Sequence, residues 1–154
     1  MPRRLLLFAA VCAIAVFAAA VVTAGGKSQR TRTLRFDEKT TLFNVVDNPP
    51  ADSGQQPEAG DTVLFRGDLM RGTKKVGTDQ GFCVVISPPV AQCTATFFFS
   101  GGSFGGSDSF DFSSKTPQGI AFMGGTGAYE GASGQGKVTQ VSNQLAHWVV
   151  TLKR

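Results

Sequence analysis

No stretch after residue 25 shows a convincing helical period; short runs of β-branched and aromatic residues alternate with Gly, Pro, Asn, Asp and Ser. This pattern predicts eight strands, at Thr33–Phe43, Asp61–Leu69, Lys75–Ile86, Cys93–Phe99, Ser107–Phe112, Gly119–Met123, Gly134–Val141 and Leu145–Leu152. Eight strands in a chain with 19 glycines predict an all-β fold, either an antiparallel sandwich or a closed barrel.

One hairpin is predicted in detail by the segment GFCVVISPPVAQC, residues 81–93, with its turn at Ser87-Pro88-Pro89. Folding about Pro88 places Cys83 directly opposite Cys93, where a disulfide can form. Two free thiols in an apolar strand pair are the alternative. We favour the disulfide because two cysteines, an even number, remain once an N-terminal leader is removed.

Both faces of this hairpin are rich in apolar side chains. One face holds Cys83, Val85, Cys93, Ala95, Phe97 and Phe99, and the other holds Phe82, Val84, Ile86 and Phe98 with Thr94 and Thr96. Such a pattern predicts strands buried on both sides. Eleven of the 13 phenylalanines follow residue 25, which suggests an interior for apolar matter, although core packing explains any single Phe.

The N-terminus has the form of a secretory signal peptide. Arg3 and Arg4 precede an uncharged apolar run from Leu5 to Val22, and small residues lead to a cleavage site after Ala24. A retained membrane anchor is the alternative. We therefore expect residues 1–24 to be removed, residues 25–154 to form one domain, and the protein to be secreted or periplasmic.

Charge and motifs argue against nucleic acids and nucleotides as partners. Without Arg3 and Arg4 the chain has 13 basic and 11 acidic residues, and no basic run is interleaved with aromatic residues. The stretch GASGQGKV, residues 131–138, resembles a phosphate-binding loop. However, Val138 replaces the Ser or Thr that would hold magnesium, and the segment KVTQVSNQLAHWVVTLKR has the composition of strands rather than of a helix.

Residues that commonly carry catalysis are sparse. His147 is the only histidine, and the acidic residues are scattered. We therefore predict no catalytic metal and no cofactor; calcium binding through Asp108 and Asp111 with nearby Ser is a weak alternative.

Three segments resemble a known family: GDTVLFRGDLMRGTKKVGTDQGFCVVI (60–86), CTATFFFSGGS, and GIAFMGGTGAYEGASGQGKV. They are similar to the allene oxide cyclase barrel family and to the related plant dirigent proteins, whose VG-x-x-QGF and GGTG-x-[FY] elements match Val76–Phe82 and Gly124–Tyr129. The resemblance implies an eight-stranded antiparallel barrel with an apolar cavity. It also implies binding of hydrophobic small molecules and a cofactor-independent cyclisation or coupling by confinement. Relatives of this barrel often form dimers or trimers, which raises the question of a homo-oligomer.

Four positions bear on the family's chemistry. Leu64 stands where allene oxide cyclases have a Pro, and Gly67 where they have a cavity Asn. Cys83 matches the cysteine of their G-x-C element, and Ser133 stands where dirigent proteins carry an Arg. The chain therefore lacks polar groups that both known chemistries use.

The residues leave two hypotheses open. The first is a secreted cyclase, a type of isomerase, or a stereochemistry-directing protein for an apolar substrate, with Arg66, Asp68, Tyr129 and Glu130 as candidate catalytic groups near the cavity. For each of these residues a solvent-facing structural role is the alternative. The second hypothesis is a non-catalytic, lipocalin-like binder or a structural barrel. An ionisable interior group with a perturbed pKa would favour the first, and a wholly apolar or filled interior the second.

Overall fold

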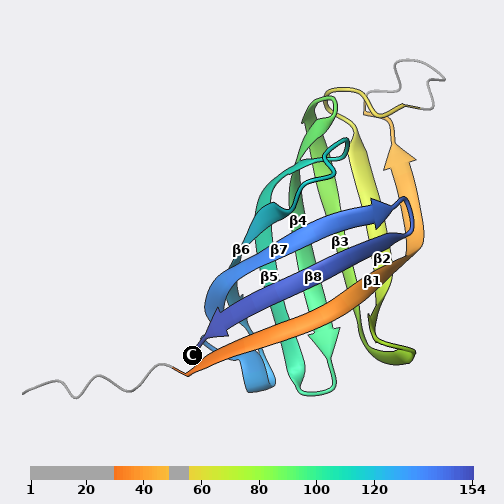
Figure 1. Ribbon diagram of the computed structural model, residues 1–154. Helices are drawn as coiled ribbons and strands as arrows, with labels where there is room; N and C mark the ends of the chain where they lie inside the picture. The colour runs from red at the N-terminus through yellow and green to blue at the C-terminus, as the bar shows by residue number, and fades with distance from the viewer. Residues whose placement is uncertain (1–29, 49–55) are drawn as a thin grey trace, which may run out of the picture.

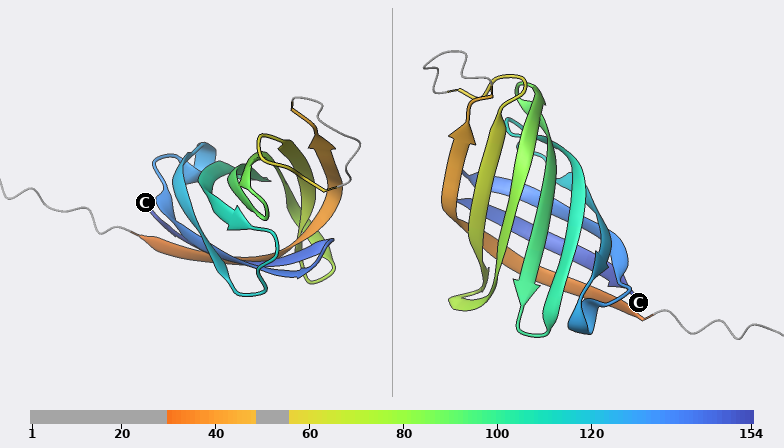
Figure 2. Two further views of the ribbon diagram at one scale, coloured as in Figure 1. Left: turned by 90° about the horizontal axis from the view of Figure 1, so that it is seen from above. Right: turned by 180° about the vertical axis from the view of Figure 1, so that it is seen from behind.

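A computed structural model describes residues 30–48 and 56–154 as a closed antiparallel barrel (Figure 1). Its elements are β1 (Thr31–Val46), β2 (Thr62–Arg71), β3 (Lys74–Ser87), β4 (Val90–Phe99), β5 (Gly102–Asp111), β6 (Gln118–Gly125), the 3₁₀ turn η1 (Gly127–Tyr129), β7 (Ser133–Ser142) and β8 (Leu145–Lys153). Each strand pairs with the next, and β1 also pairs with β8 to complete the ring (Figure 2). The predicted all-β fold is confirmed as a barrel, and each predicted strand overlaps one of the eight.

Strand β1 closes the barrel by pairing first with β8 and then with β2. Its 16 residues pair with β8 from Thr31 to Lys39 and with β2 from Asp37 to Val46. A bulge between Thr40 and Leu42 interrupts the register with β2 just where the pairing with β8 ends. Bulges bend a strand and increase its twist. In Figure 1 the end of β1 accordingly rises past the β7–β8 hairpin.

Stacked aromatic side chains fill the larger part of the interior. Phe97 is fully buried, and its ring centroid lies 5.0 Å from that of Trp148, 5.3 Å from that of Phe104 and 5.7 Å from that of Phe122. Stacked and edge-to-face contacts of this kind add to the gain from apolar burial, which is about 2–3 kcal/mol for a buried Phe. The phenylalanines inferred to form an apolar interior therefore form much of the core.

A second, smaller cluster lies on the inner face of β2, β3 and β4. It consists of Val63, Cys83, Val85, Ala91 and Cys93. The half-buried ring of Phe65 packs against both clusters and joins them.

The predicted disulfide is present in this second cluster. Cys83 and Cys93 are directly opposed in the β3–β4 register, with their Cα atoms 4.0 Å apart, and they are bonded. A register shift between Val85 and Ser87 leads into the turn at Pro88-Pro89. The symmetry of the sequence about Pro88 therefore predicted the pairing correctly.

The expectation that this hairpin is buried on both sides is wrong for the chain by itself. The inner face is buried as predicted, but on the outer face Phe82 is 46 %, Ile86 60 % and Phe98 39 % exposed. In a small barrel inward and outward side chains alternate along each strand, and the outward ones have no second layer to pack against.

Two further findings concern the ends of the sequence. Within residues 30–48 and 56–154, no helix is long and apolar enough to cross a membrane. The predicted signal peptide, residues 1–24, lies outside the described residues, and so does the proposed domain boundary at residue 25.

The stretch that resembles a phosphate-binding loop leads into β7, where Lys137 is exposed on a strand, as the sequence predicted.

Removing the disulfide should weaken the barrel without unfolding it. The double variant Cys83→Ala/Cys93→Ala is expected to lose about 2–3 kcal/mol of unfolding free energy, because a cross-link stabilises by restricting the unfolded chain. Urea unfolding followed by circular dichroism measures the loss. Reducing agent should lower the stability of the wild type and leave that of the double variant unchanged. Equal stability of reduced and oxidised wild type would contradict this assignment.

Candidate functional site

Two acidic side chains converge in the interior, Glu38 from β1 and Asp79 from β3. Both lie beside Gly67 of β2, the strand between them. A Cβ atom built on Gly67 would lie 2.5 Å from Asp79 Oδ1, 2.7 Å from Glu38 Cγ and 3.3 Å from Glu38 Oε1. The two carboxyl oxygens are thus less than about 6 Å apart, close enough for one charge to shift the pKa of the other group. The missing side chain of Gly67 makes the room that they occupy.

Strand alternation explains why these acids face inward. On β1, Glu38 follows the buried Leu34 and Phe36 at intervals of two, and on β3 Asp79 precedes the buried Cys83 by four positions. The next residue but one in each direction along a strand lies on the same face. Asp37, one position earlier than Glu38, therefore faces outward.

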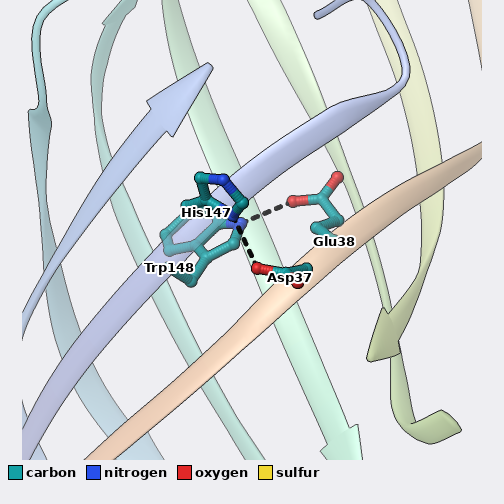
Figure 3. A network of polar contacts seen from close by, with 4 residues as sticks. All are labelled: Asp37, Glu38, His147 and Trp148. Atoms are coloured by element: carbon teal, nitrogen blue, oxygen red, sulfur yellow. Dashed lines mark hydrogen bonds and ion pairs between the residues drawn. The ribbon is translucent and has the colours of Figure 1, made fainter. Parts of the chain in front are cut away.

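Figure 3 shows how β1 and β8 hold one acid on each face. Inside, the indole Nε1 of Trp148 donates a hydrogen bond of 2.7 Å to Glu38 Oε2. Outside, His147 Nδ1 and Asp37 Oδ1 are 2.6 Å apart, and both side chains are largely exposed. The single histidine therefore lies on the outer surface, away from the interior acids.

Asp79 is the more deeply buried member of the pair, at 1 % exposure. Among the described residues neither of its carboxyl oxygens has a hydrogen-bond partner. The other buried acid, Asp61, differs, because it accepts hydrogen bonds from the backbone N–H groups of Asn48 (3.1 Å) and Glu58 (2.7 Å). Buried polar groups are normally satisfied in this way, so an unsatisfied carboxyl such as that of Asp79 is unusual.

Burial raises the pKa of Asp79 to about 8, and the neighbouring charge of Glu38 adds to the shift. The amide groups of Asp79 and Gly67 counter it in part, although neither forms a well-shaped hydrogen bond to the carboxyl. Burial also raises the pKa of Glu38, and the hydrogen bond from Trp148 opposes that rise. The pair therefore keeps a proton at neutral pH and can both donate and accept one.

The barrel is looser at the end toward which β1 rises beyond its bulge. There β1 has left β8, and the ladder between β5 and β6 stops at the pair Ser107 and Ala121. Farther along that seam the side chain of Gln118 bridges to the backbone of Asp111, accepting from its N–H at 2.7 Å and donating to its carbonyl at 3.0 Å. Two seams thus lose their strand pairing at the same end.

Inner-face side chains reach solvent at this open end. Phe43 is paired with Phe65 and so shares its inner face, yet 57 % of Phe43 is exposed. Asp108 is paired with Cys93 on the same face and is also exposed. Glu38, the last inner acid of β1 before the bulge, is only partly buried.

The structure does not bring the four sequence-predicted residues to this pair. Arg66 and Asp68 lie on the outer face of β2, where Asp68 forms an ion pair of 2.5 Å with Lys75. Tyr129 is buried in η1, its ring 5.1 Å from that of Phe104, and Glu130 follows it at the surface. Their catalytic role stays a prediction.

The positions that bear on the family's chemistry can also be placed. Gly67 leaves the room beside the acid pair, at the position where the resemblance puts a cavity Asn. Cys83 is in the disulfide, while Leu64 and Ser133 are exposed. Sequence reasoning missed Glu38 and Asp79 because each is a single acid within a strand; their inward alternation was the available signal.

In the part of the chain that the structure describes, no three His, Cys, Asp or Glu side chains are grouped so that they could hold a metal ion.

Comparison with solved structures identifies the architecture. A pterocarpan synthase dirigent protein superposes with a TM-score of 0.69 at 20 % identity, covering 82 % of this chain and 91 % of its own. The chain has the dirigent-type barrel fold. The same fold is shared with a Diels–Alderase from Streptomyces koyangensis, with a TM-score of 0.63, 14 % identity and coverage of 85 % and 72 %. The resemblance inferred from the sequence is thus confirmed for the fold.

A third similar structure is a pyocyanin demethylase, with 25 % identity and a TM-score of 0.66 over 79 % of this chain and 99 % of that one. No family model and no curated protein matches the chain. Barrels of one architecture thus carry different named activities, so function has to be argued from the side chains of the interior.

The stability of the dirigent-type barrel should depend on pH through Asp79. In the unfolded chain this group ionises near its ordinary pKa of 3.8, and in the fold near 8. Between these values the folded state binds the extra proton, so stability is highest below pH 4 and falls as pH rises toward 8. The slope is up to about 1.4 kcal/mol per pH unit. Asp79→Asn should flatten this slope and raise the melting temperature at pH 8.

Asp68→Asn is the matched control, since it removes a half-buried outer carboxylate from β2 whose charge is the smallest of the causes that raise the pKa of Asp79. Thermal melts from pH 4 to 8 compare the three proteins. Parallel curves for wild type and Asp79→Asn would show that Asp79 ionises normally in the fold.

Proposed function

We propose that this barrel binds an apolar, reactive small molecule and steers its cyclisation or coupling by proton transfer from the Glu38–Asp79 pair, without a cofactor. The observation that carries the proposal is the unsatisfied, buried carboxyl of Asp79 beside the partly exposed Glu38. Groups of this kind, with a pKa shifted by burial and a charged partner, are concentrated at functional sites. A core selected for stability alone would more readily place an apolar residue there.

Glu38 is the member that would touch the substrate. In a ring closure by addition, one oxygen of its protonated carboxyl gives a proton to the substrate's carbonyl oxygen. The other oxygen takes the proton of the attacking hydroxyl, while the new carbon–oxygen bond forms. The carboxyl ends as it began and the reaction is an isomerisation. Asp79 would keep a proton within the pair, and Trp148 would hold the carboxyl of Glu38 in position through its hydrogen bond.

The apolar nature of the ligand is part of the proposal. Three features support it: the exposed side chain of Phe43 on the inner face of β1, its paired residue Phe65 on β2, and the aromatic core deeper in the barrel. Confinement between such surfaces favours one conformer of a flexible substrate and so one stereochemical outcome. The alternative, a non-catalytic binder of the same molecules, would use these surfaces without the acids.

Export of the protein is also proposed. The support is the Cys83–Cys93 disulfide, since structural disulfides persist in oxidising compartments such as the periplasm or the cell exterior. The form of residues 1–24 points the same way.

A direct test uses 2′-hydroxychalcone, which closes spontaneously to racemic flavanone by adding its phenol across an enone. Wild-type protein should accelerate the closure and give one enantiomer in excess, measured by chiral chromatography. Glu38→Gln should reduce the acceleration by about 100-fold or more, since general acid–base catalysis contributes that much. The wild-type rate should fall as pH rises past about 8, where Asp79 loses its proton.

Four further variants decide between the acid pair and the residues predicted from the sequence: Arg66→Gln, Asp68→Asn, Tyr129→Phe and Glu130→Gln. Unchanged activity in these four together with loss in Glu38→Gln would favour the pair, and the reverse pattern would overturn it. Binding of the chalcone with neither acceleration nor enantiomeric excess would favour the non-catalytic binder.

We further propose that the outer apolar face of β2 and β3 packs against a second copy of the chain. Leu64 and Phe82 are directly opposed there, at 38 % and 46 % exposure, and Ile86 extends the patch. On β3, β4 and β5, the described outer positions from 78 to 86, 92 to 98 and 103 to 109 carry no charged side chain. Arg66 and Asp68 of β2 border this uncharged area, which offers nothing to a charged partner but can bury a copy of itself.

Phe82→Ser should therefore shift the protein from oligomer to monomer, as measured by size-exclusion chromatography with light scattering. Met123→Ser is the matched control, because Met123 is 75 % exposed on β6, away from this patch. A wild type that is monomeric at every concentration up to the millimolar range would refute the proposed interface.

A further inference from the structure

The inner face near the open end carries acids and no base. Glu38, Asp79 and Asp108 all lie on it. No Lys, Arg or His occupies an inner position from Phe36 to Val46 on β1, from Val63 to Leu69 on β2, from Gly77 to Val85 on β3, or on β4 and β5. Basic residues at inner positions lie away from the open end: Arg71 and Lys74 are paired at the β2–β3 turn, and Arg32 lies 5.6 Å over the ring of Tyr129.

Asp108 is the acid that a ligand at the open end would meet first. It is exposed, and its Oδ1 atom accepts a hydrogen bond of 2.8 Å from the backbone N–H of its neighbour Ser109. No ion pair to Asp108 occurs among residues 30–48 and 56–154. Its carboxylate is therefore available to a ligand.

Aromatic faces accompany these acids. Phe110 lies two positions from Asp108 on the same face of β5, and Phe43 and Phe65 lie on the facing β1 and β2. A cation over an aromatic ring gains from the charge distribution of the ring, and more so when a carboxylate is nearby. An anionic ligand would instead lose its hydration without finding a positive partner.

We propose that the interior site takes a flat, apolar molecule with a positive charge, such as a quaternary or protonated amine on an aromatic framework, and rejects carboxylates. This inference rests on the proposed function, since it names the substrate class of the same site. It goes further in assigning Asp108 as a residue that determines specificity.

Three 2′-hydroxychalcones that differ only at one distal ring position test this class: a trimethylammonium, a methoxy and a carboxylate derivative. Trp148, the single tryptophan of the chain, donates to Glu38, so quenching of its fluorescence reports binding at the site. We expect the ammonium compound to bind at least about 10-fold more tightly than the methoxy compound, and the carboxylate to bind more weakly than both.

Asp108→Asn should remove most of the preference for the ammonium compound while leaving the affinity for the methoxy compound unchanged. The matched control Asp37→Asn removes the same charge from the outer face of β1 and should change neither affinity. Equal affinities for the three compounds, tightest binding of the carboxylate, or no quenching by any of them would overturn the inference. Because these readouts are affinities, they are separate from the closure rates and enantiomeric excess that test the proposed function.

Discussion

The bend of β1 at the bulge between Thr40 and Leu42 is the constraint on which this barrel depends. Before the bend the strand closes the ring against β8, and after it the strand pairs with β2 alone. One strand therefore both seals the barrel and opens one end of it. Glu38 is the last inner acid before the bend, so closure itself places this carboxyl where the filled interior meets solvent.

The interior divides into two parts with different physical roles. Around Phe97, stacked aromatic side chains supply the apolar burial that stabilises the domain. Beside Gly67 the same interior holds an acid without a hydrogen-bond partner, which costs stability unless that acid keeps its proton. A protein tolerates such a cost where the group has a use, and this contrast is why we assign chemistry to the pair and structure to the rings.

The sequence was sufficient for the fold but only partly for the site. Alternation, turn residues and the spacing about Pro88 predicted the strands and the disulfide, because these depend on local chemistry that repeats along the chain. The acid pair depends on the register between three strands and on the absence of a side chain at Gly67, which no single segment encodes. The alternation of side chains along β2 offered a partial signal. Val63, Gly67 and Leu69 occupy its inner face, so the intervening residues Arg66 and Asp68 point outward.

The distribution of charge over the barrel bears on which ligand it binds. After the predicted leader the chain has a small excess of basic residues, yet the inner face at the open end is acidic, and the outer face of β4, of β5 and of β3 from Thr78 onward is neutral. The basic residues therefore lie elsewhere on the molecule, and net charge is a poor guide to what the barrel binds. Barrels of this fold carry different named activities, so the function of this chain has to be argued from its own side chains. In this chain the inner positions at the open end favour a molecule that can accept a proton or already carries a positive charge.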